Sequence, residues 1–197
     1  MFFKELYFQK ISFDKKTLRN IPFFFYTLFL AFLGSGWKIL EGIAEGQTQI
    51  DSTCNGDFAC WQHPIDLHAI WLSKIIFETS FVFLGFFNHL RLGWPKIIFE
   101  IWHKNSLDQN SLIGYGVVNV PSQPGSKKIL CPCWRPIGSV LDRLAQMFNG
   151  ESLHLSEEWL IYSSEHRFRL HTENTGSICL DLNLILKDFE KFGIETH

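Results

Sequence analysis

Hydrophobic and polar residues alternate along several segments of the second half of the chain, and this alternation predicts β-strands. Residues 96–104 alternate between two partly covered faces: Ile97, Phe99 and Ile101 on one, and Ile98, Glu100 and Trp102 on the other. Residues 176–193 gather four aliphatic side chains on one face: Ile178, Leu180, Leu182 and Leu184. Residues 166–172 also alternate, with two apolar side chains opposite three basic ones: Phe168 and Leu170 opposite Arg167, Arg169 and His171. Each of these segments is expected to form a strand.

Residues 112–125, LIGYGVVNVPSQPG, place two glycines ahead of a run of valines. A dinucleotide-binding loop needs a third glycine three residues after the second, between a strand and a helix. Asn119 occupies that position, and prolines follow where a helix would begin. The segment therefore predicts a strand ending in a turn, with Gly114 and Gly116 marking a bulge or the close approach of another backbone.

One amphipathic helix is predicted over residues 139–150, SVLDRLAQMFNG. Ser139 is a suitable N-cap, Gly150 is a suitable C-terminal residue, and apolar side chains recur at helical spacing: Val140, Leu141, Leu144, Met147 and Phe148. Such a stripe usually covers a sheet, so we expect it to pack on the core and not to form a groove for a partner. Just before it, residues 127–138 predict a short strand that ends at Pro132.

Two apolar stretches interrupt this pattern. Residues 21–37 carry no charge and follow a basic segment, which is typical of a signal peptide or of a membrane anchor of about 17–25 residues. Residues 70–87 contain Lys74 and Glu78, which are each costly at the centre of a membrane helix, so this stretch is a poor span. Between the two stretches, residues 37–69 predict short strands and turns punctuated by glycines.

Composition supports a single β-rich domain. A chain of 197 residues is long enough to bury one core, and its 46% hydrophobic content with 20 Phe and 7 Trp favours strands. The formal net charge of −2 and a pI near 6.4 argue against binding nucleic acid through a basic face. We expect an all-β fold without a nucleic-acid partner.

The five cysteines favour reduced thiols over the disulfide framework of a small secreted domain. Cys131 and Cys133 flank a proline, and Cys54, Cys60 and His63 would complete a set of zinc ligands. Neither cysteine pair has the spacing usual in structural zinc sites. We therefore expect the cysteines to serve as small hydrophobic residues of the core.

The segment HPIDLH sets His63, Asp66 and His68 within six residues, a combination that would suit a metal site or an acid-base pair. In an extended segment Asp66 and His68 share one face and two aliphatic residues share the other, which is also the pattern of an ordinary half-buried strand. The strand interpretation is favoured. The sequence has no nucleophile elbow, Walker loop, zinc-protease helix or kinase loop, so no catalytic residue, cofactor or small-molecule substrate is predicted.

Seven segments together resemble the B9 domain family: WKILEGIAEGQTQID, WQHPIDLH, GWPKIIFEIWHKNSL, LIGYGVVNVPSQPG, CWRPIG, RFRLHT and LNLILKDFEKFGIE. The resemblance covers residues 37–69 and 93–197. It implies a C2-like antiparallel β-sandwich without catalysis. It also implies a scaffold subunit of the tectonic-like complex at the ciliary transition zone and basal body, needed with other B9-domain proteins for cilium assembly and for the barrier between ciliary and plasma membranes. The partner-binding surface is left unknown.

Calcium-binding C2 domains bring several aspartates together on adjoining loops, because the ion takes six to eight oxygen ligands. Here the aspartates are isolated from one another: Asp51, Asp57, Asp66 and Asp108. We expect no calcium site. Peripheral membrane contact is expected only through partners or through weak basic spots such as Lys127 and Lys128.

Residues 1–36 and 70–92 depart from the family's pattern. The strands that the family has before Trp37 have no recognisable counterpart, and residues 70–92 resemble an insertion. The expected organisation is therefore a B9 domain over residues 37–197 with that atypical insertion, preceded by a Phe-rich segment that is either an apolar helix or mis-spliced sequence. The alternative function is a membrane-anchored C2-like module that binds lipid or protein, with residues 21–36 inserted in the bilayer.

Overall fold

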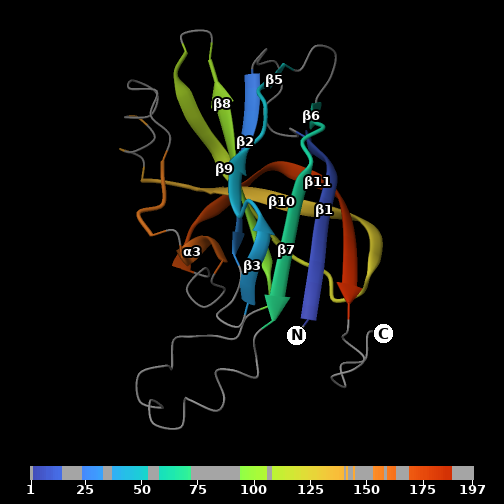
Figure 1. Cartoon of the computed structure of the whole chain (residues 1–197). Helices are drawn as coiled ribbons and strands as arrows, with labels where there is room; N and C mark the ends of the chain where they lie inside the picture. Colours follow the sequence, from blue (N-terminus) through green and yellow to red (C-terminus); the bar gives the residue numbers. More distant parts are fainter. Residues whose placement is uncertain are drawn as a thin grey trace, which may run out of the picture.

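The computed structural model describes residues 2–14, 24–32, 37–52, 58–71, 94–105, 108–139, 141, 144, 153–157, 159–162 and 169–187. Most of these residues lie in strands, and every pairing between the described strands is antiparallel. Figure 1 shows the strands in two layers.

The first layer is built on the two longest described strands, β1 (Phe2–Asp14) and β11 (Thr172–Lys187), which pair from Phe3↔Lys187 to Asp14↔Ser177. The other strands of this layer are β10 (Gly125–Pro136) beside β11, β6 (Phe58–Trp61) and β7 (Ile65–Trp71) along the far side of β1, and β3 (Trp37–Gly42) beside β7.

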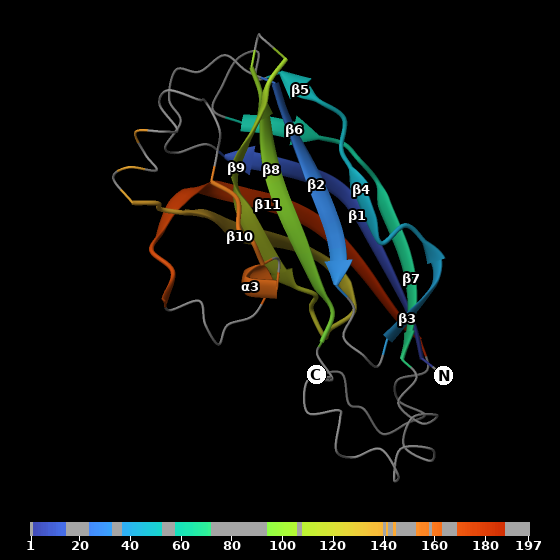
Figure 2. The same cartoon turned by 90° about the vertical axis from the view of Figure 1, so that its left-hand side faces the viewer.

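The second layer places β8 (Lys96–Lys104) between β9 (Asn110–Asn119) and β2 (Phe24–Phe32), with β4 (Glu45–Gln47) and β5 (Asp51–Ser52) on the far side of β2. The layers are joined where β10 meets β9, through the pairs Cys133↔Gly116 and Trp134↔Tyr115. On the opposite side the chain passes from β3 to β4 (Figure 2). The result is an antiparallel β-sandwich, as expected from the sequence.

The main core lies between the two layers. The predicted face of β11 is confirmed, because Ile178, Leu180 and Leu182 are fully buried and Leu184 is nearly so. The predicted alternation in β8 is confirmed as well: of its two partly covered faces, the one with Ile97, Phe99 and Ile101 packs in the same cluster. From β2 the core receives Phe25 and Phe29. Large apolar side chains from both layers thus exclude water from the sandwich interior.

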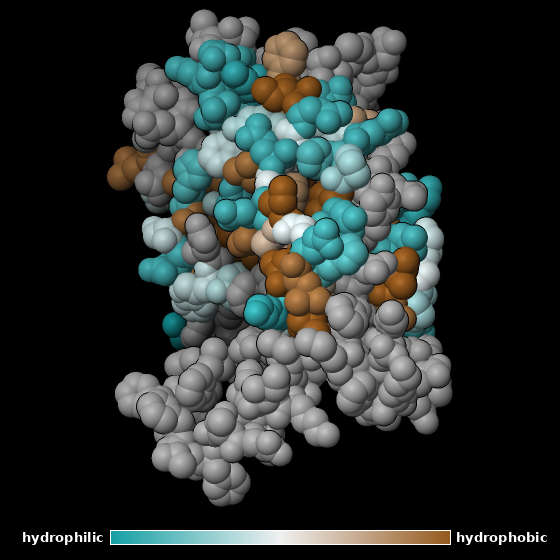
Figure 3. Space-filling view, viewed as in Figure 1, coloured by the Kyte–Doolittle hydropathy of each residue, from teal (hydrophilic) through white to brown (hydrophobic). Residues whose placement is uncertain are grey.

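A second hydrophobic cluster covers the outer face of β8 and β9. A short helix, α3 (Trp159–Tyr162), and residues 153–157 lie over this face, and the cluster's buried members are Ile98, Leu112, Tyr115, Trp134 and Ile161. Two hydrogen bonds hold the covering segment: the Leu155 backbone N–H donates to the Tyr115 hydroxyl at 3.2 Å, and Lys96 Nζ donates to the Tyr162 carbonyl at 3.0 Å. The outer face of this layer is therefore only partly open. Figure 3, viewed as in Figure 1, shows hydrophobic residues lying among hydrophilic ones on the side of the molecule that faces the viewer.

The N-terminal part of the chain corrects an expectation. Residues 2–14 and 24–32 form β1 and β2, two integral strands of the sandwich, where the sequence predicted no counterpart of the family's first strands. The apolar run that suggested an anchor or an apolar helix is rich in Phe because β2 contributes side chains to the core and also to the outer face. No helix among the described residues is long and apolar enough to cross a membrane.

The expected insertion at residues 70–92 falls mostly outside the described residues. Its first two residues belong to β7, where Ile70 is fully buried and pairs with Phe3 and Lys38. The regular part of the domain therefore extends through Trp71.

Three further predictions differ from the structure. Of the predicted helix at 139–150, the described helical residues Leu141 and Leu144 are 77% and 47% exposed, so these two side chains do not pack on the core as expected. Residues 169–171 lie outside the strand that begins at Thr172. The strand expected to stop at Pro132 continues to Pro136, because β10 keeps its pairing with β11 through the proline.

Candidate interaction surface

The residues of HPIDLH lie on and just before β7. Ile65 and Leu67 are buried, and Asp66 and His68 share the outer face, where His68 Nε2 lies 3.3 Å from Asp66 Oδ1. The His63 ring instead contacts the Phe29 ring, with centroids 6.0 Å apart. The three side chains therefore do not converge, and the strand interpretation of this segment is confirmed.

The described cysteines occupy two environments. Cys131 and Cys133 of β10 are buried in the main core, whereas Cys60 and Cys179 are half-buried. Cys54 lies outside the described residues. The neighbouring Cys131 thiol and burial raise the pKa of Cys133 well above its usual value, so this thiol stays protonated. At these two positions the expected role as core hydrophobes is confirmed.

The described aspartates are engaged at separate places. Asp51 Oδ2 accepts a hydrogen bond from the Cys60 backbone N–H at 2.8 Å and thereby links β5 to β6. Asp66 faces His68, and Asp108 lies 2.8 Å from Lys104 Nζ. Asp57 lies outside the described residues. Within the described part of the chain, no group of three or more His, Cys, Asp or Glu side chains is arranged to hold a metal ion.

The two basic residues considered for membrane contact sit at the start of β10. Lys127 Nζ donates to Gln123 Oε1 at 2.7 Å, and Lys128 Nζ lies 3.9 Å from Asp181 Oδ1. Both positive charges thus have local polar partners.

Gly114 and Gly116 mark a bulge and a close approach, as predicted. The pairing of β8 with β9 shifts register next to Gly114, between Ile101 and Trp102. A Cβ at Gly114 would lie 2.6 Å from Thr175 Oγ1 and 2.9 Å from the Trp134 carbonyl oxygen. A side chain at that position would collide with β10 and with Thr175 of β11, so the glycine is required where the two layers meet.

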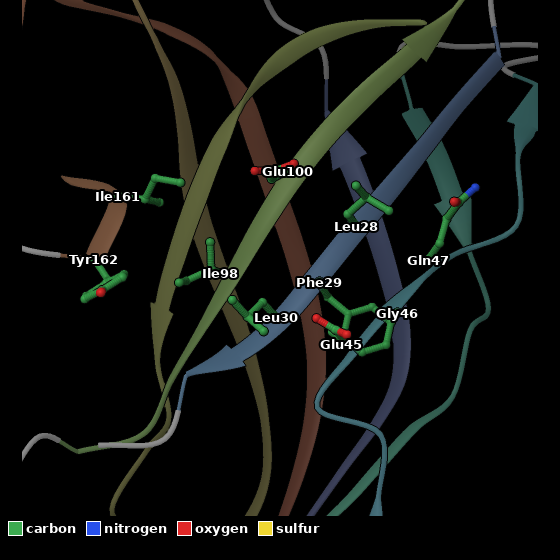
Figure 4. A pocket seen from close by; sticks show the side chains of 10 residues that line it. All are labelled: Leu28, Phe29, Leu30, Glu45, Gly46, Gln47, Ile98, Glu100, Ile161 and Tyr162. Atoms are coloured by element: carbon green, nitrogen blue, oxygen red, sulfur yellow. The ribbon is translucent and has the colours of Figure 1, made fainter. Parts of the chain in front are cut away.

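A groove of about 440 Å³ crosses the outer face of the second layer (Figure 4). Strands β2 and β8 form its floor, α3 forms one wall, and β4 forms the other; the lining residues are Leu28, Phe29, Leu30, Glu45, Gly46, Gln47, Ile98, Glu100, Ile161 and Tyr162. We call this the β2–β4 groove. It occupies the part of this sheet face that borders α3 and is not covered by it.

The register in which β2 pairs with β8 and β4 determines which side chains form the floor of the β2–β4 groove. Leu28 pairs with Glu100 and Gln47, and Leu30 pairs with Ile98 and Glu45, so these side chains form two rows on the same face. At Gly46 the β4 backbone lies so close to the Phe29 ring that a Cβ there would be 2.6 Å from Phe29 Cζ. An apolar floor thus lies between two carboxylates.

The aromatic side chains beside this floor are tightly connected. The Tyr26 and Trp102 rings stack at 6.3 Å with an interplanar angle of 8°, and Trp102 Nε1 donates to Glu100 Oε2 at 3.2 Å. Burial raises the pKa of Tyr26, Lys104 lowers it and Glu100 raises it. Glu100 is therefore held in place at the groove by an aromatic pair.

This groove was not predicted from the sequence. Its residues come from segments up to about 130 positions apart, and the β2 residues were assigned to an apolar run outside the domain. In β2 the outward-facing Leu28 and Leu30 alternate with the inward-facing Phe25 and Phe29. Such alternation indicates a strand, but it is hard to recognise in the sequence because the residues on both faces are apolar.

Comparison with known proteins identifies the family. The family described as "Ciliary basal body-associated, B9 protein" matches residues 23–185, which include every described strand from β2 to β10 and most of β11. The chain belongs to the B9 domain family.

Curated members of the B9 family align over most of the chain. B9 domain-containing protein 2 of Danio rerio is 40% identical over 163 residues, which are 83% of each chain. The Homo sapiens protein of that name is 40% identical over 82% of this chain and 83% of its own length. B9 domain-containing protein 1 of Mus musculus is more distant, at 25% identity over 83% of this chain and 73% of its own length. The names of these relatives refer to the domain that they contain and state no enzymatic reaction.

Solved C2 domains align with the B9 chain at low similarity. A structure described as "Structure of a C2 domain" covers 95% of this chain and 99% of its own, with 11% identity and a TM-score of 0.37. A C2 domain of plant Extended Synaptotagmin 1 covers 94% of this chain and 93% of its own, with 12% identity and a TM-score of 0.37. The sandwich itself is established by the strand pairing described above.

Proposed function

We propose that this B9 chain is a non-catalytic scaffold subunit of the tectonic-like complex at the ciliary transition zone. In this role it supports cilium assembly and the barrier between the ciliary and plasma membranes. The observation that carries the proposal is the family match over residues 23–185, to a family described as ciliary basal body-associated. The relatives share 40% identity over 83% of the chain, which supports a common role.

The geometry supports a binding role over a catalytic one. The residues that suggested chemistry have structural tasks: Asp66 faces His68 on a strand surface, and the Cys133 thiol is buried and protonated. The surface instead offers a partly open sheet face with the β2–β4 groove, whose floor includes the exposed side chain of Leu30. Scaffolds recognise partners through such surfaces and edges, without a titrating group.

Other B9-domain proteins are the proposed partners. This chain is also related to B9 domain-containing protein 1 of Mus musculus at 25% identity, so it belongs to a set of related sandwiches. The anchored-module alternative is not favoured, because the stretch that would insert in lipid contains β2, which pairs with β8 from Phe24↔Lys104 to Phe32↔Lys96.

The test is affinity purification of the tagged full chain from ciliated cells, followed by mass spectrometry. We expect B9-domain relatives and tectonic-type proteins to be recovered. A matched pair of variants on β11 controls for folding: Leu182→Asp places a charge in the core, whereas Ile185→Asp places it on a half-exposed face. Leu182→Asp should lose the partners. Recovery of chaperones alone with the unaltered chain would contradict the proposed function.

A further inference from the structure

We propose that the β2–β4 groove binds an extended segment of a partner protein that presents lysine or arginine side chains together with aliphatic side chains on one face. This inference rests on the proposed function for the existence of a protein partner, and it adds the chemistry that the partner must present.

The floor of the groove provides an apolar surface that is partly open to solvent. Leu30 is 36% exposed and Leu28 beside it is half-buried, while Ile98 and Ile161 are buried beneath the α3 side of the groove. A volume of about 440 Å³ is enough to receive several side chains. An aliphatic side chain placed here would be removed from water on most sides.

The charges at the groove select a cationic partner. Glu45 and Glu100 are the carboxylates among the described lining residues, and no lysine, arginine or histidine is among them. Lys104 pairs with Asp108, whereas the Lys96 ammonium donates to the carbonyl of Tyr162 on the α3 side of the groove and keeps its charge. With two carboxylates in the lining and one lysine beside it, the groove presents net negative charge next to an apolar floor.

Lysine and arginine match both features at once. Their aliphatic stems can lie along Leu28 and Leu30 while their charged ends reach the carboxylates of Glu100 and Glu45. A membrane of anionic lipid would instead be repelled by these carboxylates, and a small inorganic cation would leave the apolar floor uncovered. The combination favours a protein segment over either.

The test uses the purified full chain and three short fluorescein-labelled peptides in an anisotropy titration. The Lys-Leu peptide repeats two lysines followed by two leucines, so that each face of the extended chain carries both residues. The second peptide replaces its lysines by glutamate, and the third replaces its leucines by serine. We expect only the Lys-Leu peptide to bind, with affinity that falls as salt rises. Equal binding of the glutamate peptide would overturn the proposal, as would equal binding of the serine peptide.

Variants locate the binding to the groove. Glu45→Gln combined with Glu100→Gln should weaken binding of the Lys-Leu peptide about tenfold, the effect of two partly exposed ion pairs. Glu41→Gln, an exposed carboxylate on β3, is the matched control and should have no effect. Leu30→Ser should also weaken binding, whereas Leu130→Ser, at a residue that is 69% exposed on β10, should not. Circular dichroism spectra must match for all four proteins, and unchanged affinity in the groove variants would overturn the proposal.

Two further measurements separate the alternatives. If Leu30→Ser abolished binding to phosphatidylserine vesicles, the groove would be a lipid site and the proposal would fall. In the purification experiment, loss of B9-domain relatives from the Glu45→Gln, Glu100→Gln chain alone supports the groove as their site. Absence of those relatives with the unaltered chain counts against the scaffold function, while the peptide titration still reports on the groove.

Discussion

Trp61 and Phe25 connect the two layers of the sandwich through a hydrogen bond inside the core. The Trp61 indole Nε1, on β6, donates to the Phe25 backbone carbonyl, on β2, at 3.1 Å. Trp61 is fully buried, and the Phe25 ring packs against Phe13 of β1 with centroids 6.2 Å apart. A polar contact of this kind fixes the position of β6 against β2 more closely than apolar packing alone.

Replacing this indole tests its contribution. Trp61→Phe removes the hydrogen bond and leaves part of the indole volume empty, so we expect the free energy of unfolding to fall by about 2–4 kcal/mol. Urea denaturation followed by circular dichroism measures the change. Trp159→Phe, at a partly exposed tryptophan of α3, is the control and should cost less than about 1 kcal/mol. If the free energy of unfolding fell equally in both variants, the Trp61 hydrogen bond would contribute no more to stability than the partly exposed Trp159 side chain does.

Gly116 and the thiol of Cys131 are expected to be energetically coupled. A Cβ at Gly116 would lie 3.0 Å from Cys131 Sγ and 3.2 Å from Cys133 Sγ, so Gly116→Ala should destabilise the fold by about 1–3 kcal/mol. Cys131→Ala removes the nearest sulfur and should relieve part of this loss. A double-mutant cycle measures the coupling by urea denaturation. Gly125→Ala is the control, because no atom lies within 4 Å of its Cβ position and its effect should simply add to that of Cys131→Ala.

Stability should decrease at alkaline pH because the pKa of Cys133 is raised. Below the usual thiol pKa of 9.0, Cys133 is protonated in both the folded and the unfolded chain, so its contribution does not change with pH. Above that value the unfolded chain releases a proton that the folded chain retains, and the free energy of unfolding falls by at most about 1.4 kcal/mol per pH unit from this group. Tyr26 adds a loss of the same sign above its usual pKa of 10.0.

Urea denaturation between about pH 8 and pH 10, under reducing conditions, measures this slope. Cys133→Ala should flatten the dependence while lowering stability at every pH. An unchanged slope in this variant would show that the Cys133 thiol does not cause the alkaline loss. Alkylation of the native chain gives an independent reading: iodoacetamide should label Cys60 and Cys179 before Cys131 and Cys133.

Calcium is expected to leave the melting temperature unchanged. Asp51 Oδ2 is engaged with the Cys60 backbone N–H, and Asp66 and Asp108 lie beside His68 and Lys104, so these carboxylates have structural tasks. Asp51→Ala should instead destabilise the chain by about 1–3 kcal/mol, because the Cys60 N–H loses its charged acceptor. Differential scanning fluorimetry with calcium and with EGTA checks the first expectation. A rise in melting temperature with calcium that Asp51→Ala abolishes would contradict it.

Short-range patterns in the sequence predicted much of the fold. The alternation in residues 96–104 and 178–184 determines which side chains face the core, since a strand sends neighbours to opposite faces. Gly114 was assigned to a bulge or close approach because it lies within a run of β-branched residues, and the crowding by Thr175 and Trp134 agrees with this.

The strand at 24–32 was missed because both of its faces are covered by apolar side chains. Phe25 and Phe29 point inward while Phe24 and Leu30 point outward, so the alternation of polarity disappears and the stretch resembles a membrane segment. The β2–β4 groove was missed for a related reason. It depends on the pairing of Leu30 with Ile98 and Glu45, which only long-range sheet topology creates.

The pairing of β1 with β11 determines when the sandwich can be completed during synthesis. One side of β1 is filled by β6 and β7 once residue 71 has left the ribosome, but its other side meets β11, which extends to Lys187. For most of translation the nascent chain therefore carries one open strand edge, a site where another chain can pair. The layer of β2, β8 and β9 is complete by residue 119 and is free to form earlier. The strand order thus leaves the β1 edge unpaired until the last described strand has been synthesised.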